Sequence, residues 1–298
     1  MVSLDGAFHI YISYGIVFVL AGAVYYCSNY KKFMEKKAKR ILGPYVFFGI
    51  ITLLLKAFGG SAINGVESTG EGIIKFLFHG GNYWFLYVLF ILFAIYPWIE
   101  KVCKKWEVEA AFAVFVLVVR QFNTVTSFLS ISTLLYYIPY FVAGKLISRK
   151  IYSGRGTASL SGRTKRITLL TGAVLYCLLE CFEISRGEDL GNILSFIRAM
   201  SIIAVLYVIV GMILKNSSGR QGLVYNLVTD CGKYSLQLYL FNGFLLTALR
   251  IVICNVMKIT SPIIIVGGIW IGNLVITLVA CKYIIPRIPI LRELCGLK

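Results

Sequence analysis

The two histidines of this sequence are the first residues that could do acid–base chemistry. They are His9 and His79, and His79 directly precedes Gly80 and Gly81. Histidine titrates near neutral pH and is the commonest general acid or base, although an interfacial packing role is the more frequent one. The sequence has no HExxH, GxSxG, P-loop or dinucleotide-binding motif, so it shows no active site of the kind found in soluble enzymes.

An arginine inside an apolar run is the second candidate. Arg198 lies within the run 190–214. Exposing an arginine to lipid costs roughly 2.5–3.5 kcal/mol on insertion scales, so Arg198 should face the interior of a helix bundle and find an acidic partner. Glu180 or Glu183, near the end of the preceding apolar run, could reach it. Such a pair would be either a structural ion pair or part of a polar cavity in the outer half of the bundle.

A basic cluster is the third candidate. Residues 31–40 read KKFMEKKAKR, and Lys37 and Arg40 are three residues apart, so they would share one face of a helix. Clusters of this kind bind the phosphates of anionic, nucleotide-like molecules. A solvated loop that orients the chain in a membrane has the same composition.

The cysteines do not indicate a metal site. Of the 8 cysteines, Cys177 and Cys181 are one helical turn apart, but no histidine is near them in the sequence. Packing is therefore the favoured role for these two residues, and we expect no metal.

The composition indicates that these residues are carried by membrane helices. The chain has 298 residues, of which 58% are hydrophobic and 14% charged, and its mean hydropathy is +0.81. Soluble domains are about 45–50% apolar and about 25% charged, so the surplus apolar surface must face lipid. The net charge of +17 lies in short clusters between apolar runs, which is typical of membrane topology signals and argues against nucleic-acid binding.

Nine apolar runs have lengths near those of bilayer-spanning helices, which need about 17–25 residues. They are 7–26, 43–59, 82–99, 108–122, 127–147, 167–183, 190–214, 234–254 and 261–284. We therefore predict an all-α, polytopic helical bundle with about nine transmembrane helices, forming a single domain over 1–298. The stretch 71–79 could be a short amphipathic helix lying on the membrane.

The basic residues predict the orientation of the chain. Lys and Arg are concentrated in alternate loops, namely 27–42, 100–107, 145–166, 215–233 and the C-terminal tail. These segments carry the whole net positive charge, whereas the other loops are neutral. The positive-inside rule therefore predicts a cytoplasmic C-terminus and, with nine spans, an N-terminus on the outside.

Four segments in order resemble a known family. They are KKAKRILGPY (36–45), NYWFLYVLFILFAIYP (82–97), GKYSLQLYLFN (232–242) and IPILRELCG (288–296). Together they resemble the membrane acyltransferase 3 family of bacteria, over essentially the whole chain from about residue 7.

The resemblance implies a function. Members have about ten transmembrane helices in the bacterial cytoplasmic membrane. They transfer an acyl group, often acetyl, from cytoplasmic acyl-CoA to a carbohydrate of the cell envelope or an exported glycan. Acyl-CoA is then a co-substrate, with no permanently bound cofactor. Lys37 and Arg40 match the family's donor-binding motif, with Lys37 at a position usually occupied by arginine, whose bidentate phosphate contacts lysine cannot make.

Two departures from the family pattern bear on activity. The family's first span carries an Arg or Lys and, about ten residues later, a histidine treated as catalytic, whereas this chain resembles the family from the second span onward, with His9 at the start of that span. Asn242 stands where many members have histidine. The resemblance thus implies that the first span is missing, through truncation, a misplaced start or degeneration.

Acyl transfer to a hydroxyl needs a general base and donors for a developing oxyanion. Of the polar residues available, His79, Arg198 and Asn242 are catalytic candidates, and Tyr83 and Trp84 are candidates on the acceptor side. The alternatives are a transporter or flippase of a glycan or small molecule, and an inactive partner in glycan assembly. A transporter predicts helices broken near the membrane midplane.

Overall fold

The computed structural model of the chain is helical throughout its described part. This observation confirms the all-α fold class. The described residues are 4–59, 69–122, 130–153, 161–186, 191–216, 222–259 and 261–296.

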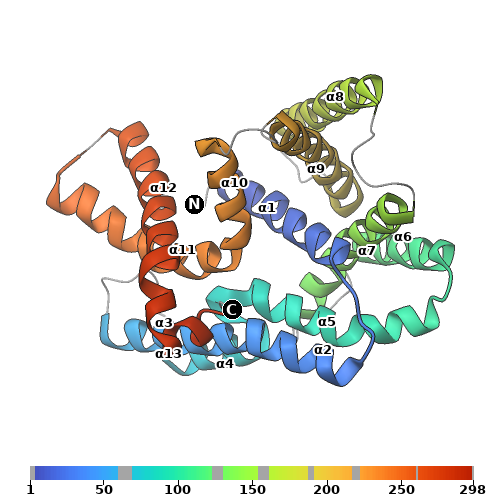
Figure 1. Ribbon diagram of the computed structural model, residues 1–298. Coiled ribbons are helices and arrows are strands. Elements are labelled where there is room, and N and C mark those ends of the chain that lie inside the picture. The colour runs from blue at the N-terminus through green and yellow to red at the C-terminus, as the bar shows by residue number, and fades with distance from the viewer. Residues whose placement is uncertain are drawn as a thin grey trace. The chain divides into compact units, whose positions relative to one another are not determined.

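Each of the nine predicted spans coincides with a helix (Figure 1). These helices are α1 (Leu4–Ala23), α3 (Gly43–Gly59), α5 (Trp84–Val102), α6 (Trp106–Gln121), α7 (Ile131–Ser153), α8 (Gly162–Arg186), α9 (Gly191–Asn216), α11 (Ser235–Arg250) and α12 (Pro262–Val279). Six described stretches are long and apolar enough to cross a bilayer, which makes this a multi-pass membrane protein. They are Gly72–Val102, Ile131–Arg149, Gly162–Ser185, Gly191–Met212, Ser235–Val256 and Ile264–Arg287.

The count of nine spans stays a prediction, because three of the helices fall short of that criterion in the described residues. α3 has 17 residues and α6 has 16, and the apolar stretch found in α1 is Tyr14–Ala23.

Shorter elements connect the long helices. They are α2 (Tyr30–Lys37), α4 (Thr69–His79), α10 (Leu223–Lys233), α13 (Pro289–Leu294), the π-turns η1 (Ala38–Leu42), η6 (Ile251–Val256) and η7 (Ala280–Ile284), and the 3₁₀ turns η3 (Gly81–Tyr83) and η8 (Ile285–Arg287). α4 confirms the helix predicted over 71–79, while its position on the membrane remains a prediction. It ends at His79 and is followed by Gly80, whose φ of +79° is the left-handed conformation that glycine adopts readily at helix ends.

The helices group into two compact units, each built from two separate stretches of chain. The first unit comprises residues 1–30 and 91–218, and the second comprises 31–90 and 219–298. The single domain over 1–298 remains a prediction.

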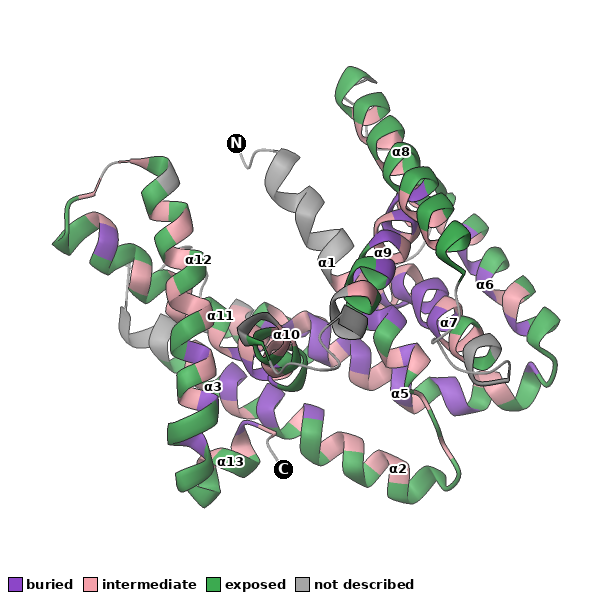
Figure 2. Cartoon of the chain, turned by 45° about the horizontal axis from the view of Figure 1, so that its top comes forward, coloured by how far each residue is buried: buried purple, intermediate pink, exposed green. Residues whose placement is uncertain are grey.

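In the first unit, α1 and α7 pack with their backbones in direct contact. A Cβ atom on Gly22 would overlap the carbonyl of Phe141, and one on Gly144 would overlap the carbonyl of Val19. Small residues allow membrane helices to approach this closely. α8 packs on α9 and is otherwise mostly exposed, as Figure 2 shows, so its apolar side chains suit contact with lipid.

In the second unit, aromatic rings join α3 to η3 and α11. The ring of Phe48 is buried and its centroid lies 6.2 Å from that of Tyr83, 5.3 Å from that of Phe241 and 6.0 Å from that of Phe244. This core holds the middle of α3 in place beside the turn at Gly81–Tyr83.

Candidate functional site

The second unit brings together the segments that carry the family resemblance: 36–45, the start of 82–97, 232–242 and 288–296. The amide of Gln237 donates a hydrogen bond to the carbonyl of Cys295 at 2.7 Å. The hydroxyl of Tyr83 donates to the carbonyl of Leu240 at 3.4 Å. Segments far apart in the chain therefore form one packed site region.

The basic motif lies on a π-turn. Lys37 is the last residue of α2 and Arg40 is in η1. Pro44 has no N–H to donate to the carbonyl of Arg40 four residues earlier, and its ring would crowd that carbonyl, so the helix widens there. The widened turn is closed by a bond from the Gly43 N–H to the carbonyl of Ala38.

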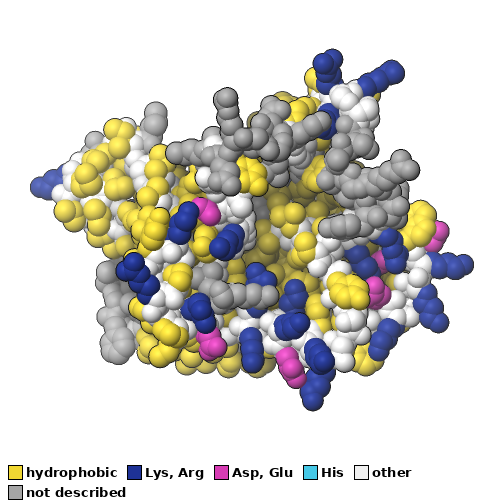
Figure 3. Space-filling view, in the orientation of Figure 1, with side chains coloured by type: hydrophobic (Ala, Val, Ile, Leu, Met, Phe, Trp, Pro, Cys, Tyr) yellow, Lys and Arg dark blue, Asp and Glu magenta, His cyan; other side chains and the backbone are white. Residues whose placement is uncertain are grey.

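Lys37 and Arg40 influence each other electrostatically. Burial and, as the smaller cause, the positive charge of Arg40 together lower the pKa of Lys37 to about 8. The Lys37 ammonium also lies over the ring of Phe33, 5.3 Å from its centroid. Figure 3 shows Lys and Arg side chains gathered over the part of the face where α2 runs. The arrangement suits a phosphate-bearing ligand.

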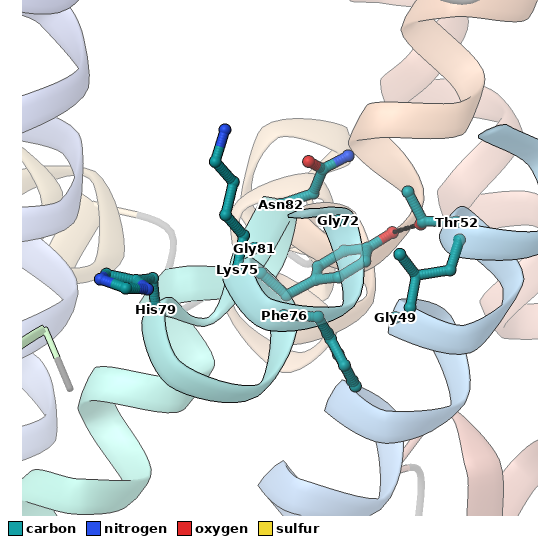
Figure 4. Close-up of a pocket in the computed structure, with 10 residues that line it drawn as sticks. Gly49, Thr52, Gly72, Lys75, Phe76, His79, Gly81 and Asn82 are labelled. Atoms are coloured by element: carbon teal, nitrogen blue, oxygen red, sulfur yellow. Dashed lines mark hydrogen bonds between the residues drawn. The ribbon is translucent and has the colours of Figure 1, made fainter. Parts of the chain in front are cut away.

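A cavity of about 420 Å³ lies between α3, α4 and η3 (Figure 4). Small-molecule sites occupy about 300–1,000 Å³, so its size suits a ligand. It is lined by Gly49, Thr52, Leu53, Gly72, Lys75, Phe76, His79, Gly81, Asn82 and Tyr83. The predicted residues His79 and Tyr83 thus line one cavity.

Hydrogen bonds and a close packing contact shape this cavity. The hydroxyls of Thr52 and Tyr83 are 3.5 Å apart, and the dashed line in Figure 4 marks this bond. The hydroxyl of Tyr45 donates to the carbonyl of Phe76, and the two rings stack with centroids 4.8 Å apart. A Cβ atom on Gly49 would overlap the Phe76 ring, so glycine is required for α3 and α4 to approach this closely.

The other predicted residues lie elsewhere. Trp84 begins α5 and does not line the cavity, and Asn242 accepts a hydrogen bond from the amide of Asn273 at 2.8 Å, which links α11 to α12. In Figure 4 the side chain of His79 points away from Thr52. The side chain of His9 lies outside the described residues.

Arg198 belongs to the first unit and is paired as the sequence predicted. Its side chain is 4% exposed, and its guanidinium donates to the carboxylate of Glu183. The carboxylate of Glu180 lies 3.6 Å from the same nitrogen. Both acidic partners come from α8, so the ion pairs join α8 to α9 and no described contact assigns Arg198 to the cavity.

A second buried charge cluster was missed in the sequence. The ammonium of Lys145 lies 2.7 Å from the carboxylate of Glu109 and 2.8 Å from that of Glu100. The side chain of Glu109 is 2% exposed and also accepts a hydrogen bond from the hydroxyl of Tyr96. The available signal was that Lys145 and Glu109 each fall inside a predicted span, where an ionised group needs a partner.

Among the residues that the structure describes, no group of three or more His, Cys, Asp or Glu side chains could hold a metal ion. The described intramembrane carboxylates pair with Lys145 and Arg198.

Comparison with protein families gives one match over most of the chain. Residues 8–282 match the acyltransferase domain that defines the acyltransferase 3 family. Comparison with curated proteins and with solved structures gives no match.

Proposed function

This chain belongs to the acyltransferase 3 family of membrane-bound acyltransferases, and we propose that it transfers an acyl group, in the first instance acetyl, from cytoplasmic acyl-CoA to a hydroxyl of a cell-envelope or exported carbohydrate. The observation that carries the proposal is that one helix, α3, follows the basic motif directly and lines the cavity with Gly49, Thr52 and Leu53.

The distance along this helix suits an acyl-CoA molecule that reaches from the basic motif to the cavity. Arg40 and Thr52 are twelve residues apart, which is about 18 Å of helix. In acyl-CoA, the arm that joins the diphosphate to the sulfur is about 16 Å long when fully extended, if each bond adds as much length as a bond of an extended polypeptide. A donor with its phosphates at Lys37 and Arg40 would therefore present its thioester at the cavity.

The cavity offers the groups that acyl transfer requires. The acceptor hydroxyl attacks the thioester carbonyl, a C–O bond forms, and the C–S bond breaks to release CoA. With its side chain turned toward Thr52, His79 would take the proton of the acceptor hydroxyl and return it to the departing sulfur. The hydroxyl of Tyr83 and the amide of Asn82 would donate to the developing oxyanion.

The positions of the helix irregularities favour this proposal over a transporter. In the described long stretches, η6 ends the stretch Ser235–Val256, η7 lies in the last third of Ile264–Arg287, and the turn at Gly80 lies in the first third of Gly72–Val102. A transporter site would instead need helices interrupted near their middle.

The donor assignment is tested by charge reversal. We expect Lys37→Glu/Arg40→Glu to weaken acetyl-CoA binding by well over about tenfold, because two attractive contacts become repulsive. Binding is measured by calorimetry on protein in nanodiscs. The control is Lys31→Glu/Lys32→Glu, which makes the same change of charge on α2. Unchanged binding in the first variant, or an equal loss in both, would refute a specific site at Lys37 and Arg40.

A further inference from the structure

The last described residues form the short helix α13, which is followed by a glycine in the left-handed backbone conformation. α13 begins at Pro289, and the last described residue is Gly296, whose φ is +69°. Glycine adopts this conformation without the steric cost that other residues incur.

Gly296 lies against the π-turn that carries the basic motif. A Cβ atom on Gly296 would lie 2.9 Å from the carbonyl oxygen of Arg40, 3.2 Å from the Pro44 ring and 3.3 Å from the Leu236 side chain. The Arg40 carbonyl is the one to which Pro44 cannot donate a helical hydrogen bond. Gly296 therefore lies close to the backbone at the point where the helix departs from α geometry, and α13 lies beside α3 (Figure 1).

A buried amide holds the other side of this contact. Gln237 is 2% exposed, and its amide nitrogen donates to the carbonyl of Cys295 at 2.7 Å. Cys295 itself is 1% exposed. The C-terminal segment 288–296 is thus fixed on α11 by Gln237 and touches η1 and α3 through Gly296.

We propose that the C-terminal segment 288–296 positions the donor site, with Gly296 and Gln237 as positioning residues that set the place of Arg40 and its neighbour Lys37. The inference rests on the proposed function, because it gives the basic motif the role of binding acyl-CoA. Neither positioning residue touches the donor. Each acts by holding the backbone of the π-turn.

The test compares Gly296→Ala with Gly211→Ala. Position 211 lies in helix α9 of the first unit, with nothing within 4 Å of an added Cβ, so the same substitution there meets no neighbour. Gln237→Leu is the second variant, which removes the hydrogen bond to Cys295 while keeping the size of the side chain. Hydrogen exchange of peptides covering 36–46, the KM for acetyl-CoA and kcat are measured for each variant in nanodiscs.

We expect faster exchange over 36–46 in Gly296→Ala and Gln237→Leu, and a KM for acetyl-CoA raised roughly tenfold, because small displacements of binding groups are costly. The kcat should stay close to that of the wild type, and Gly211→Ala should match the wild type throughout. Exchange as slow as in the wild type, or a fall in kcat alone, would overturn the inference.

The two proposals fail in different ways. If the wild-type protein binds acetyl-CoA and both variants bind it equally well, the positioning role falls and the proposed function stands. If the wild-type protein does not bind acetyl-CoA, the donor assignment falls and this inference falls with it.

Discussion

The lowered pKa of Lys37 makes donor binding depend on pH in a predictable direction. Burial and the nearby charge of Arg40 bring this pKa to about 8, from an ordinary value of 10.5. Only the protonated ammonium attracts phosphate, so affinity for acetyl-CoA should be constant well below pH 8 and fall above it. At pH 9 about one tenth of Lys37 is still protonated in the free protein, so affinity should be about tenfold lower than at pH 7.

The matched substitution is Lys37→Arg. Arginine stays protonated above pH 12, and it also restores bidentate contact with phosphate, so this variant should bind more tightly and keep its affinity to pH 9. Calorimetry with acetyl-CoA between pH 7 and pH 9.5 measures the effect, in a range where the phosphates of the donor stay ionised. Lys36→Arg, an exposed neighbour, should follow the wild-type curve. An equal fall in the wild type and in Lys37→Arg would refute the role of Lys37.

Two further predictions concern the buried cluster and the cavity. Lys145→Met would leave the carboxylate of Glu109 buried without its cation, at a cost of about 3–5 kcal/mol in the free energy of unfolding. We therefore expect a clear fall in melting temperature, which the exposed control Lys104→Met should not show. Equal melting temperatures for the two variants would contradict the buried ion pair. Gly49→Ala would displace the Phe76 ring, which lines the cavity, so transfer of radiolabelled acetyl to an envelope carbohydrate should fall at least about tenfold with acetyl-CoA binding retained. Gly267→Ala, with open space around it, should transfer normally, and full transfer by Gly49→Ala would contradict the role of the cavity.

Helix positions could be predicted from the sequence because they depend on local composition and on the thickness of a bilayer. The prediction 43–59 has the same bounds as α3. Pro97 and Pro139 lie inside α5 and α7 without ending them, as membrane helices tolerate. The division of the chain into two units could not be predicted, because it depends on contacts between segments about a hundred residues apart.

Contacts between residues that are close in the sequence could be predicted, whereas contacts between distant residues could not. Arg198 and its partner Glu183 are only fifteen residues apart on successive helices, so their pairing could be inferred. The π-turn has a local signal in Pro44, which cannot donate the helical hydrogen bond to Arg40. The hydrogen bond between Asn242 and Asn273 had no such signal, because it depends on how α11 and α12 pack.

The direct backbone contact between α1 and α7 has a consequence for biosynthesis. Gly22 and Gly144, which allow it, are 122 residues apart in the chain. A nascent chain grows at about 5–20 residues per second, so Gly22 is synthesised roughly 6–24 s before Gly144. During that interval, α1 cannot make this contact. The first unit can be completed only after α7 leaves the ribosome.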